Sequence, residues 1–406
     1  MKASSLVCKG CSARYPLEAL FACAACFGPL EVAYDGIDDP VGRDAVAAGP
    51  PTLWRYRDFL PVDSPGDGLP VGMSPLVPAP RLAEALGLGC DLYVKTETSN
   101  PTHSFKDRVV AIAAAKAREL GFEALACAST GNLAGATAAA GAALGLPTYI
   151  FVPSDLEREK IVAAAAYGST VFAVDGSYDD VNRLCSELAY ERPWAFVNVN
   201  MRAYYAEGSK TIALETAEQL DWRAPDRVVA PIASGSLYCK ILQGFRQGRA
   251  AGLIEPGADP VMHGAQGAGC APVATAFAEG AGDVRPVRPT GIAKSLAIGN
   301  PADGVFALDA ARATGGTIES AADDEIVAGI RLLASTTGIF TETAGGVTVA
   351  VLRHLAERGH IADHETVVAY ITGDGLKTID AVSDSLSTVA VPADVDAVDQ
   401  VLAAAV

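Results

Sequence analysis

The feature that most limits what this chain can fold into is an alternation of short apolar segments with helical ones. From Cys90 onward, apolar runs of strand length are followed by stretches with 3.6-residue periodicity, such as 104–121, 132–145 and 156–168. Short strands that are apolar throughout are typical of parallel sheets covered by helices on both faces. The pattern predicts an α/β protein with two parallel sheets. The expected strands are 90–95, 124–129, 147–153, 169–175, 194–200, 226–234, 261–267 and 366–373.

Length and charge exclude several classes of protein. The chain has 406 residues, half of them hydrophobic, which is enough for two domains with buried cores. Its net charge of −17 has the wrong sign for binding a polyanion, and the basic residues form no local patch. The apolar runs fall short of the roughly 18 residues of a membrane span, and the N-terminus has no signal-peptide core. We therefore expect a cytoplasmic protein that binds neither nucleic acid nor membranes.

Four of the nine cysteines are organised as two CxxC pairs, Cys8 with Cys11 and Cys23 with Cys26. Four thiolates at this spacing can surround Zn²⁺, and the short segment has too few apolar residues to fold alone. The alternative is a ribbon-like segment that folds against the body with free thiols. In both cases the role is structural, because four cysteines leave no open coordination position. The other five cysteines lie in apolar or helical stretches, where a buried thiol is expected.

In open α/β sheets ligands bind where strands give way to helices. At the first such junction, SNPTHSFKDR, the turn at Pro101 precedes Ser104, which we expect to cap a helix with Lys106 in its first turn. The positive end of the helix dipole favours the neutral amine, as a nucleophilic or imine-forming lysine requires. The alternative is an exposed lysine balanced by Asp107.

Three further junctions carry polar or small residues. Ser129, Thr130 and Asn132 open a helix and offer hydroxyls, an amide and backbone N–H groups to an anion such as a carboxylate, although a plain N-cap needs only one of them. The run 233–236, Ala-Ser-Gly-Ser, lets several backbone amides surround a phosphate. Thr372 ends a strand and places a hydroxyl where it can meet a ring nitrogen, but the TGDG sequence by itself indicates only a turn.

Together these junctions resemble the sites of pyridoxal-phosphate enzymes of fold type II, the tryptophan synthase β-like family. Additional blocks narrow the resemblance to the threonine synthases, in the form with an N-terminal cysteine ribbon. The resemblance extends from Cys8 to about Asp380. Its blocks are GMSPLV, NPTHSFKDR, CASTGNLA, YDDVNRLCSELA, YYAEGSKT, GAQGAGCAPV, AKSLAIGNPADG, FTETAGGVT and ITGDGLKT.

The resemblance implies a role for each candidate residue. Lys106 would bind the cofactor aldehyde as an imine and then move protons on the substrate, with Phe105 packed behind it. Asn132 would bond the ring oxygen, Thr372 would face the ring nitrogen, and Ser129 and Thr130 would take the substrate carboxylate. The cofactor phosphate would rest on the backbone of Ala233, Ser234, Gly235, Ser236 and Leu237. Cys8, Cys11, Cys23 and Cys26 remain the candidate metal ligands.

The implied reaction converts O-phosphohomoserine and water to threonine and phosphate. This phosphorylated amino acid needs a second cationic patch, for which Lys95, Lys210 and Arg202 are the candidates. Three positions depart from the family pattern: Asp374 stands where Asn is more usual, Thr337 where Glu is more usual, and the phosphate cup has less glycine. The alternatives are a serine or threonine dehydratase or a β-replacement synthase of the same fold, and a binding protein that is not an enzyme.

The same resemblance implies a homodimer and two three-layer α/β domains. The expected division is a zinc-ribbon-like segment over 1–35, a linker with the first part of the large domain over 36–94, a smaller domain over 95–205 and the large domain over 206–406. We expect the Pro- and Gly-rich linker near 41–75 to wrap the body without entering its core. The tail after Thr388 is expected to be a peripheral strand or helix.

Overall fold

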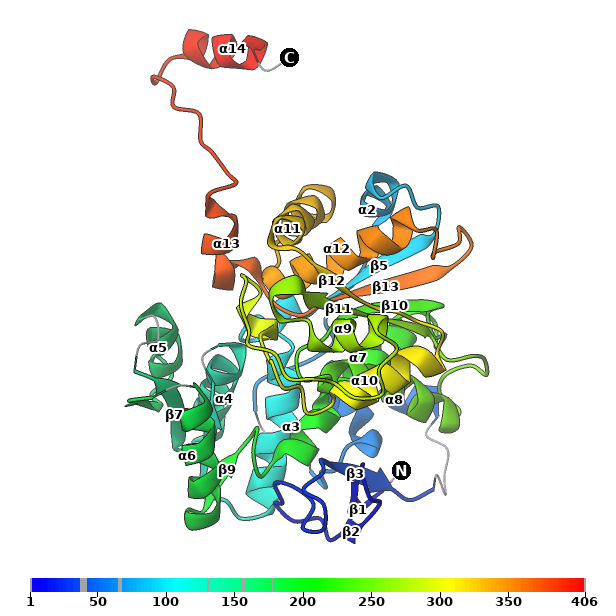
Figure 1. The fold of residues 1–406 in the computed structure, drawn as a ribbon, viewed down its shortest axis with the longest axis vertical. Helices are drawn as coiled ribbons and strands as arrows, with labels where there is room; N and C mark the ends of the chain where they lie inside the picture. Colours follow the sequence, from blue (N-terminus) through cyan, green and yellow to red (C-terminus); the bar gives the residue numbers. More distant parts are fainter. Residues whose placement is uncertain are drawn as a thin grey trace.

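Two mainly parallel sheets and a small N-terminal sheet organise the chain (Figure 1). The structure, a computed structural model, describes residues 2–36, 42–64, 68–129, 131–154, 158–176 and 178–404. The predicted alternation of strands and helices is confirmed at all eight expected strands, although β9 ends at Phe196, four residues before the predicted end. The sequence analysis did not identify β4 and β12 as strands of the body.

The larger sheet has the strand order β12-β11-β10-β13-β5-β4, and only the edge pair β4–β5 is antiparallel. The last strand of the sequence therefore lies in the middle of the sheet. The strands are β4 (Leu76–Pro78), β5 (Asp91–Thr96), β10 (Arg227–Pro231), β11 (Val261–Gly267), β12 (Ile318–Ala321) and β13 (Thr366–Ile371).

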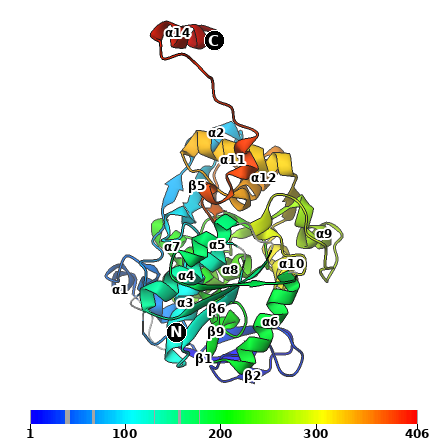
Figure 2. The same cartoon turned by 90° about the vertical axis from the view of Figure 1, so that its left-hand side faces the viewer.

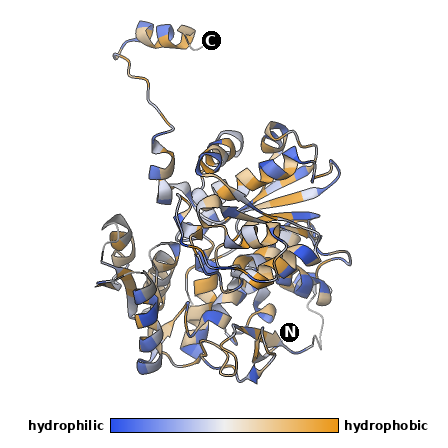
Figure 3. Ribbon diagram, in the orientation of Figure 1, coloured by the Kyte–Doolittle hydropathy of each residue, from blue (hydrophilic) through white to orange (hydrophobic). Residues whose placement is uncertain are grey.

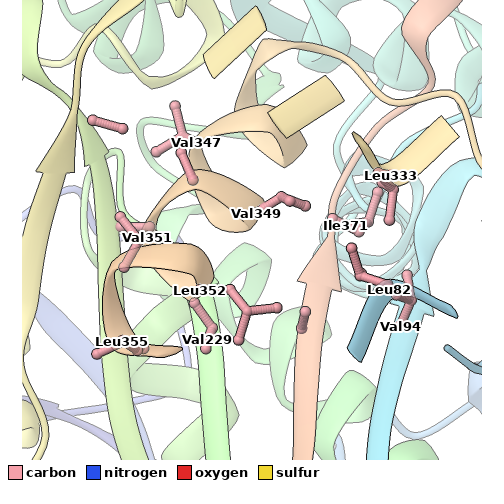
Figure 4. Packing of buried hydrophobic residues seen from close by; sticks show 14 of the residues in the cluster. Leu82, Val94, Val229, Leu333, Val347, Val349, Val351, Leu352, Leu355 and Ile371 are labelled. Carbon is pink, nitrogen blue, oxygen red and sulfur yellow. The ribbon is translucent and has the colours of Figure 1, made fainter. Parts of the chain in front are cut away.

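Helices cover both faces of this sheet. Successive residues of its strands point to opposite faces, so each strand contributes side chains to two cores. Val229 of β10 belongs to the core under one helical layer, whereas Val228 and Ala230 belong to the core under the other. The first layer is α2 (Pro80–Ala85), α11 (Asp323–Thr337) and α12 (Thr343–Glu357); the second is α7 (Arg202–Gln219), α8 (Ser236–Ala250), α9 (Pro272–Ala278) and α10 (Gly304–Ala313). Figure 4 shows how α12 packs Val347, Val351 and Leu352 against the strands.

The smaller sheet is parallel, with the order β8-β7-β6-β9. Its strands are β6 (Ala124–Ala128), β7 (Thr148–Pro153), β8 (Thr170–Val174) and β9 (Trp194–Phe196). Helices α3 (Lys106–Glu119) and α4 (Asn132–Leu144) pack on one face of this sheet, and α6 (Tyr178–Glu191) packs on the other. Helix α5 (Arg158–Ala165) lies beside α4 (Figure 2). Helix α3 also packs along α7, so it joins the two sheets.

The N-terminal segment is an antiparallel sheet of β1 (Ala3–Cys8), β2 (Arg14–Tyr15) and β3 (Leu30–Tyr34), in the order β2-β1-β3. Buried side chains of β1 and β3 share a core with α3 and α7. Glu31 and Tyr34 of β3 also contact Lys240 and Glu207 of the body. The segment is therefore docked on the body rather than suspended from it.

The linker makes a larger contribution to the core than we expected. Between α1 (Arg43–Ala47) and β4, the 3₁₀ segment η1 (Leu53–Phe59) buries Leu53, Tyr56 and Phe59 completely. The prediction of a linker outside the core is therefore wrong, because its Pro and Gly residues flank an apolar stretch. The remaining short elements are η2 (Glu97–Ser99), η3 (Ala268–Cys270), η4 (Lys294–Leu296), η5 (Gly375–Thr378) and α13 (Asp380–Ser383).

The tail ends in α14 (Val395–Ala404), which stands apart from the body in both views (Figures 1 and 2). Hydrophobic and hydrophilic residues alternate along it (Figure 3), and none of its described residues is buried. The predicted peripheral strand or helix is therefore a helix. Among the helices of the described residues, none has the length and hydropathy to cross a membrane.

Candidate active site

The loop before α3 is joined to the end of β13. Ser104 forms an antiparallel bridge with Gly373, and the backbone N–H of Phe105 donates to the carbonyl of Thr372 at 3.0 Å. The N–H of Asp374 donates in turn to the carbonyl of His103 at 3.0 Å. These bonds fix the first turn of α3 against the carboxyl end of a central strand. Lys106 and Thr372, far apart in sequence, are thereby brought to one place.

Lys106 is the first residue of α3 and is half-buried. Its Nζ donates to the Tyr205 hydroxyl at 2.9 Å and lies 4.6 Å from the centre of the Phe105 ring, so Phe105 does pack beside the amine. The amine therefore has a defined direction and keeps access to the site.

The prediction that Ser104 caps this helix is wrong. The N-cap is Phe105, which makes no side-chain cap, and the buried Ser104 Oγ has no hydrogen-bond partner among the described residues. Asp107 instead turns back and accepts from the N–H and hydroxyl of Thr102 at 2.8 and 2.7 Å. In the alternative interpretation this carboxylate would balance Lys106, but in the structure it holds the preceding turn.

Asn132 begins α4 and is held between two charged residues. Its Nδ2 donates to both carboxylate oxygens of Glu342, at 3.2 and 3.0 Å, and its Oδ1 accepts from Lys377 Nζ at 2.7 Å. Lys377 Nζ also donates to the Thr102 carbonyl. These contacts orient the amide and connect it to the loop that carries Lys106.

Glu342 and Lys377 are functional candidates that the sequence analysis did not single out. Glu342 is 3% exposed at the N-terminus of α12, and burial raises the pKa of its carboxyl, against the opposing effect of Lys377 and Lys106. Burial lowers the pKa of Lys377. Glu342 lies in FTETAGGVT and Lys377 in ITGDGLKT, two of the blocks that carry the family resemblance. A charged residue within such a Gly-rich block could have indicated a site residue.

The predicted phosphate cup lies between β10 and α8, with Ala233, Ser234 and Ser236 half-buried and Leu237 buried. Gly235 has a φ of +93°, and a Cβ there would lie 2.7 Å from the carbonyl oxygen of Asp303, so only glycine fits. Because the first N–H groups of a helix have no partners within it, the start of α8 can bind an anion. Strands β10 and β13 pair in parallel, which places the cup beside Thr372.

The other predicted binding residues have different surroundings. Ser129 directly follows β6 and is buried, and its Oγ accepts from the N–H of Gly131 at 3.3 Å, whereas Thr130 lies outside the described residues. Thr372 is 3% exposed at the end of β13. Arg202 is partly exposed and pairs with Asp303 at 2.6 Å.

Lys95 and Lys210 are both fully buried in ion pairs. Lys95 Nζ lies 2.5 Å from Glu215, and Lys210 Nζ lies 2.5 Å from Glu207. Burial lowers the pKa of Lys210 to about 8, although Glu207 opposes this shift. Lys95 belongs to β5 of the larger sheet, at the predicted boundary of the smaller domain. A substrate contact at either lysine would require its ion pair to open, so these two assignments remain predictions.

The four N-terminal cysteines converge as the spacing predicts. Their Sγ atoms all lie within 4.8 Å of one another, with Cys8–Cys26 and Cys11–Cys23 at 3.5 Å. Four sulfurs around one Zn²⁺ would be about 3.8 Å apart, given Zn–S bonds of about 2.3 Å. The arrangement therefore fits a tetrahedral metal ion.

Similarity to known proteins agrees with this geometry. Residues 68–373 match the family described as pyridoxal-phosphate dependent enzyme. A threonine synthase of Methanosarcina acetivorans is 37% identical over 401 residues, covering 98% of each chain, and one of Methanocaldococcus jannaschii is 37% identical over 380 residues, covering 92% of this chain and 93% of the relative. The chain belongs to the threonine synthase family of pyridoxal-phosphate dependent enzymes.

Solved structures with this family's fold confirm the predicted fold type II architecture. The processed form of threonine deaminase isoform 2 from Solanum lycopersicum superimposes with a TM-score of 0.64 at 23% identity, over 78% of this chain and 88% of that one. A fungal L-serine ammonia-lyase from Rhizomucor miehei gives 0.64 at 19% identity, over 77% and 96%. At this identity the match shows the fold alone. Within the threonine synthase family, the amine at the start of α3 and the anion-binding start of α8 fit a pyridoxal-phosphate site.

Proposed function

We propose that this chain is a threonine synthase that converts O-phosphohomoserine and water to L-threonine and phosphate. The observation that carries the proposal is the junction of the Lys106 loop with the end of β13, in a chain that matches threonine synthases over nearly its whole length. When bound, pyridoxal phosphate supplies an aldehyde that condenses with amines and a ring that delocalises the charge left by proton removal. The residues around it bind, orient and move protons.

Lys106 is the proposed catalytic residue. Its Nζ would bind the cofactor aldehyde and, once displaced by the substrate amine, carry protons between the substrate carbons. The Tyr205 hydroxyl, 2.9 Å away in this structure, gives the released amine a resting partner. Asn132 would donate to the ring oxygen next to the aldehyde, and this requires its Nδ2 to be shared with or released by Glu342.

Other residues would hold the two ends of the cofactor. The backbone of 233–237 would take the phosphate at the start of α8, and Thr372 would face the ring nitrogen with a neutral hydroxyl rather than a carboxylate. Ser129 and Thr130 would receive the substrate carboxylate. Two buried hydroxyl oxygens have no partner among the described residues: that of Ser104, two residues before Lys106, and that of Thr343, next to Glu342. Both can take further hydrogen bonds.

For the substrate phosphate we propose Lys377. Its side chain reaches solvent, although its surroundings partly desolvate the amine. Its Nζ donates to Asn132 Oδ1 and to the Thr102 carbonyl, while the carboxylates of Glu342, Asp107 and Asp374 act on it electrostatically. Lys95 and Lys210 are already neutralised by buried carboxylates, so Lys377 is the better placed amine. Arg202 stays a second candidate near the cup.

The test is to supply purified holoenzyme with O-phosphohomoserine and, separately, with serine and threonine. We expect phosphate and threonine in equal amounts from the first substrate, and no 2-oxobutyrate or pyruvate from the others. Lys106→Ala should abolish turnover and the absorbance of the lysine-bound cofactor. Rapid 2-oxo acid formation without phosphate release would identify a dehydratase instead.

We also propose that the cysteine cluster holds one structural Zn²⁺ and that the protein is a cytoplasmic homodimer. None of the nine cysteines, all of which the structure describes, forms a disulfide, so the four clustered sulfurs can serve as metal ligands. Metal analysis of the purified protein should find about one zinc per chain, and Cys26→Ser should lower that content. A metal-free, fully folded protein would contradict the zinc assignment, and light scattering would measure the oligomeric state.

A further inference from the structure

Lys9 extends from the cysteine segment into the body of the enzyme. It lies between Cys8 and Cys11 in the first CxxC turn, but its Nζ is 3.1 Å from Asp303 Oδ1 and 3.7 Å from the centre of the Phe306 ring. A side chain from the first ten residues thus reaches the start of α10. Asp303 and its partners line a small cavity together with Ser236, the first residue of α8.

Asp303 is shared by two cations. Its Oδ2 accepts from Arg202 Nη2 at 2.6 Å while Lys9 contacts Oδ1, and the Asp303 side chain is only 8% exposed. A carboxylate this buried requires compensation, because removing a charge from water is unfavourable. Each oxygen therefore has its own cation, one from the N-terminal segment and one from α7.

The backbone of Asp303 forms one wall of the phosphate cup. Its N–H donates to the Ser234 carbonyl at 2.8 Å. A Cβ placed on Gly235 would lie 2.7 Å from the Asp303 carbonyl oxygen and 3.0 Å from its Cβ. A negative side chain is consequently fixed next to the site where the cofactor phosphate, itself nearly doubly charged, is proposed to bind.

We propose that Lys9 and Arg202 are positioning residues for cofactor binding: they neutralise Asp303 and so allow the cup at the start of α8 to hold the phosphate of pyridoxal phosphate. The N-terminal cysteine segment then completes the active site, in addition to any role in stability. The inference rests on the proposed location of the cofactor phosphate.

The first test is Lys9→Met in the full chain, which keeps the length of the side chain and removes its charge. We expect the dissociation constant for pyridoxal phosphate, measured by titration of the protein after cofactor removal, to rise about tenfold, because Asp303 loses half of its compensation. The ³¹P resonance of the bound cofactor should shift as well. Lys2→Met, at an exposed lysine of the same segment, is the matched control and should leave both readouts unchanged. An unchanged affinity in Lys9→Met overturns the proposal.

The second test separates charge from mechanical support. Asp303→Asn removes the carboxylate, so it should bind the cofactor at least as tightly as the wild type and should restore the affinity of Lys9→Met in the double variant. If Lys9 only docks the segment, Asp303→Asn will weaken binding and rescue nothing. Asp303→Asn alone keeps the proposal falsifiable even if Lys9→Met does not fold.

A third variant distinguishes failure of this inference from failure of the proposed cup. Ser236→Asp places a carboxylate at the start of α8 and should weaken cofactor binding by at least about tenfold. If it has no effect, the cup assignment is wrong and the inference falls with it. If Ser236→Asp weakens binding and Lys9→Met does not, only the inference is wrong.

Discussion

At the residue scale, the site is organised around one amide. Asn132 is held by a carboxylate on its Nδ2 and an ammonium on its Oδ1, and both of these side chains come from the C-terminal third of the chain. The sequence analysis identified Asn132 and Lys106 from the junctions at which they lie. It did not identify Glu342 and Lys377, because their importance comes from contacts between segments distant in sequence.

Lys377→Met should impair substrate binding more than chemistry. The variant removes the solvent-exposed amine that we assign to the substrate phosphate, so we expect KM for O-phosphohomoserine to rise by about tenfold or more, with a smaller loss in kcat. Steady-state kinetics at saturating cofactor would measure both. Lys377→Arg should recover part of the loss, and a variant with an unchanged KM would remove Lys377 from the substrate site.

Glu342→Gln should change how stability depends on pH. The folded-state pKa of Glu342 is raised above the usual 4.5, so its contribution to stability is complete below that value and is lost as pH rises through the raised pKa. The free energy of unfolding of Glu342→Gln relative to the wild type should therefore increase with pH above about 4.5. Denaturant titrations of the cofactor-free protein at several pH values would measure it.

Glu325→Gln supplies a control of opposite sign. The backbone N–H of Ala322 and the side chain of His354 lower the pKa of Glu325. The contribution of Glu325 to stability is therefore present above pH 4.5 and is lost as the pH falls through the lowered pKa. This variant should be less stable than the wild type at neutral pH and approach it in acid. The same trend in both variants would contradict the assignment for Glu342.

At the element scale, a buried ion cluster fixes α3 relative to the larger sheet. Arg108, two residues after Lys106, pairs with Glu97 at 2.6 Å and Glu215 at 2.8 Å, and all three side chains are fully buried. Lys95 of β5 completes the cluster by contacting Glu215. The cluster thus ties the helix that begins with the catalytic amine to α7 and β5.

Arg108→Met should strongly destabilise the fold, because two carboxylates lose their principal partner. Loss of one member of a buried ion pair costs about 3–5 kcal/mol. Denaturant unfolding would measure the difference. Arg118→Met, at an exposed position of the same helix, should cost less than about 0.5 kcal/mol and provides the matched control.

Much of the element order was predictable from the sequence, whereas its assembly was not. Apolar strands such as 226–234 and 261–267 are recognisable because both of their faces are buried. Strand β12 (Ile318–Ala321) is short and partly polar, and its pairing with β11 gives no local signal. The buried ion cluster could not be predicted either, because a charged residue is stable inside a core only when a partner distant in sequence compensates its charge. The wrong prediction of a Ser104 cap has a related cause. Asp107 accepts the hydrogen bonds that shape this turn, and the sequence alone did not show this.

At the scale of the whole molecule, the N-terminal segment and the C-terminal tail differ in how closely they contact the body. The N-terminal segment is joined to the body through Lys9, Glu31 and Tyr34. The tail from Thr388 onward leads to α14, which has no buried residue among those described and stands away from the body (Figure 1). Within the described residues, the N-terminal segment reaches the proposed site through Lys9, whereas α14 does not.

Removing the chain from Thr388 onward should leave turnover of O-phosphohomoserine within about twofold of the full-length enzyme, because exposed terminal segments without packing contacts tolerate truncation. Removing residues 1–35 should instead expose the buried side of α7 and reduce both stability and cofactor retention. Thermal unfolding and cofactor titration of the two truncated proteins would compare them. A tail deletion that inactivates the enzyme would show that α14 has a partner in solution.

The position of β13 has a consequence for biosynthesis. This strand is the last of the sheet to be made, yet it inserts between β10 and β5 and carries Thr372 at its end. While the ribosome is still adding earlier residues, the two halves of the sheet have no bridge and Lys106 has no neighbour on that side. We therefore expect a growing polypeptide to form a complete cofactor pocket only after β13 and Thr372 have left the ribosome.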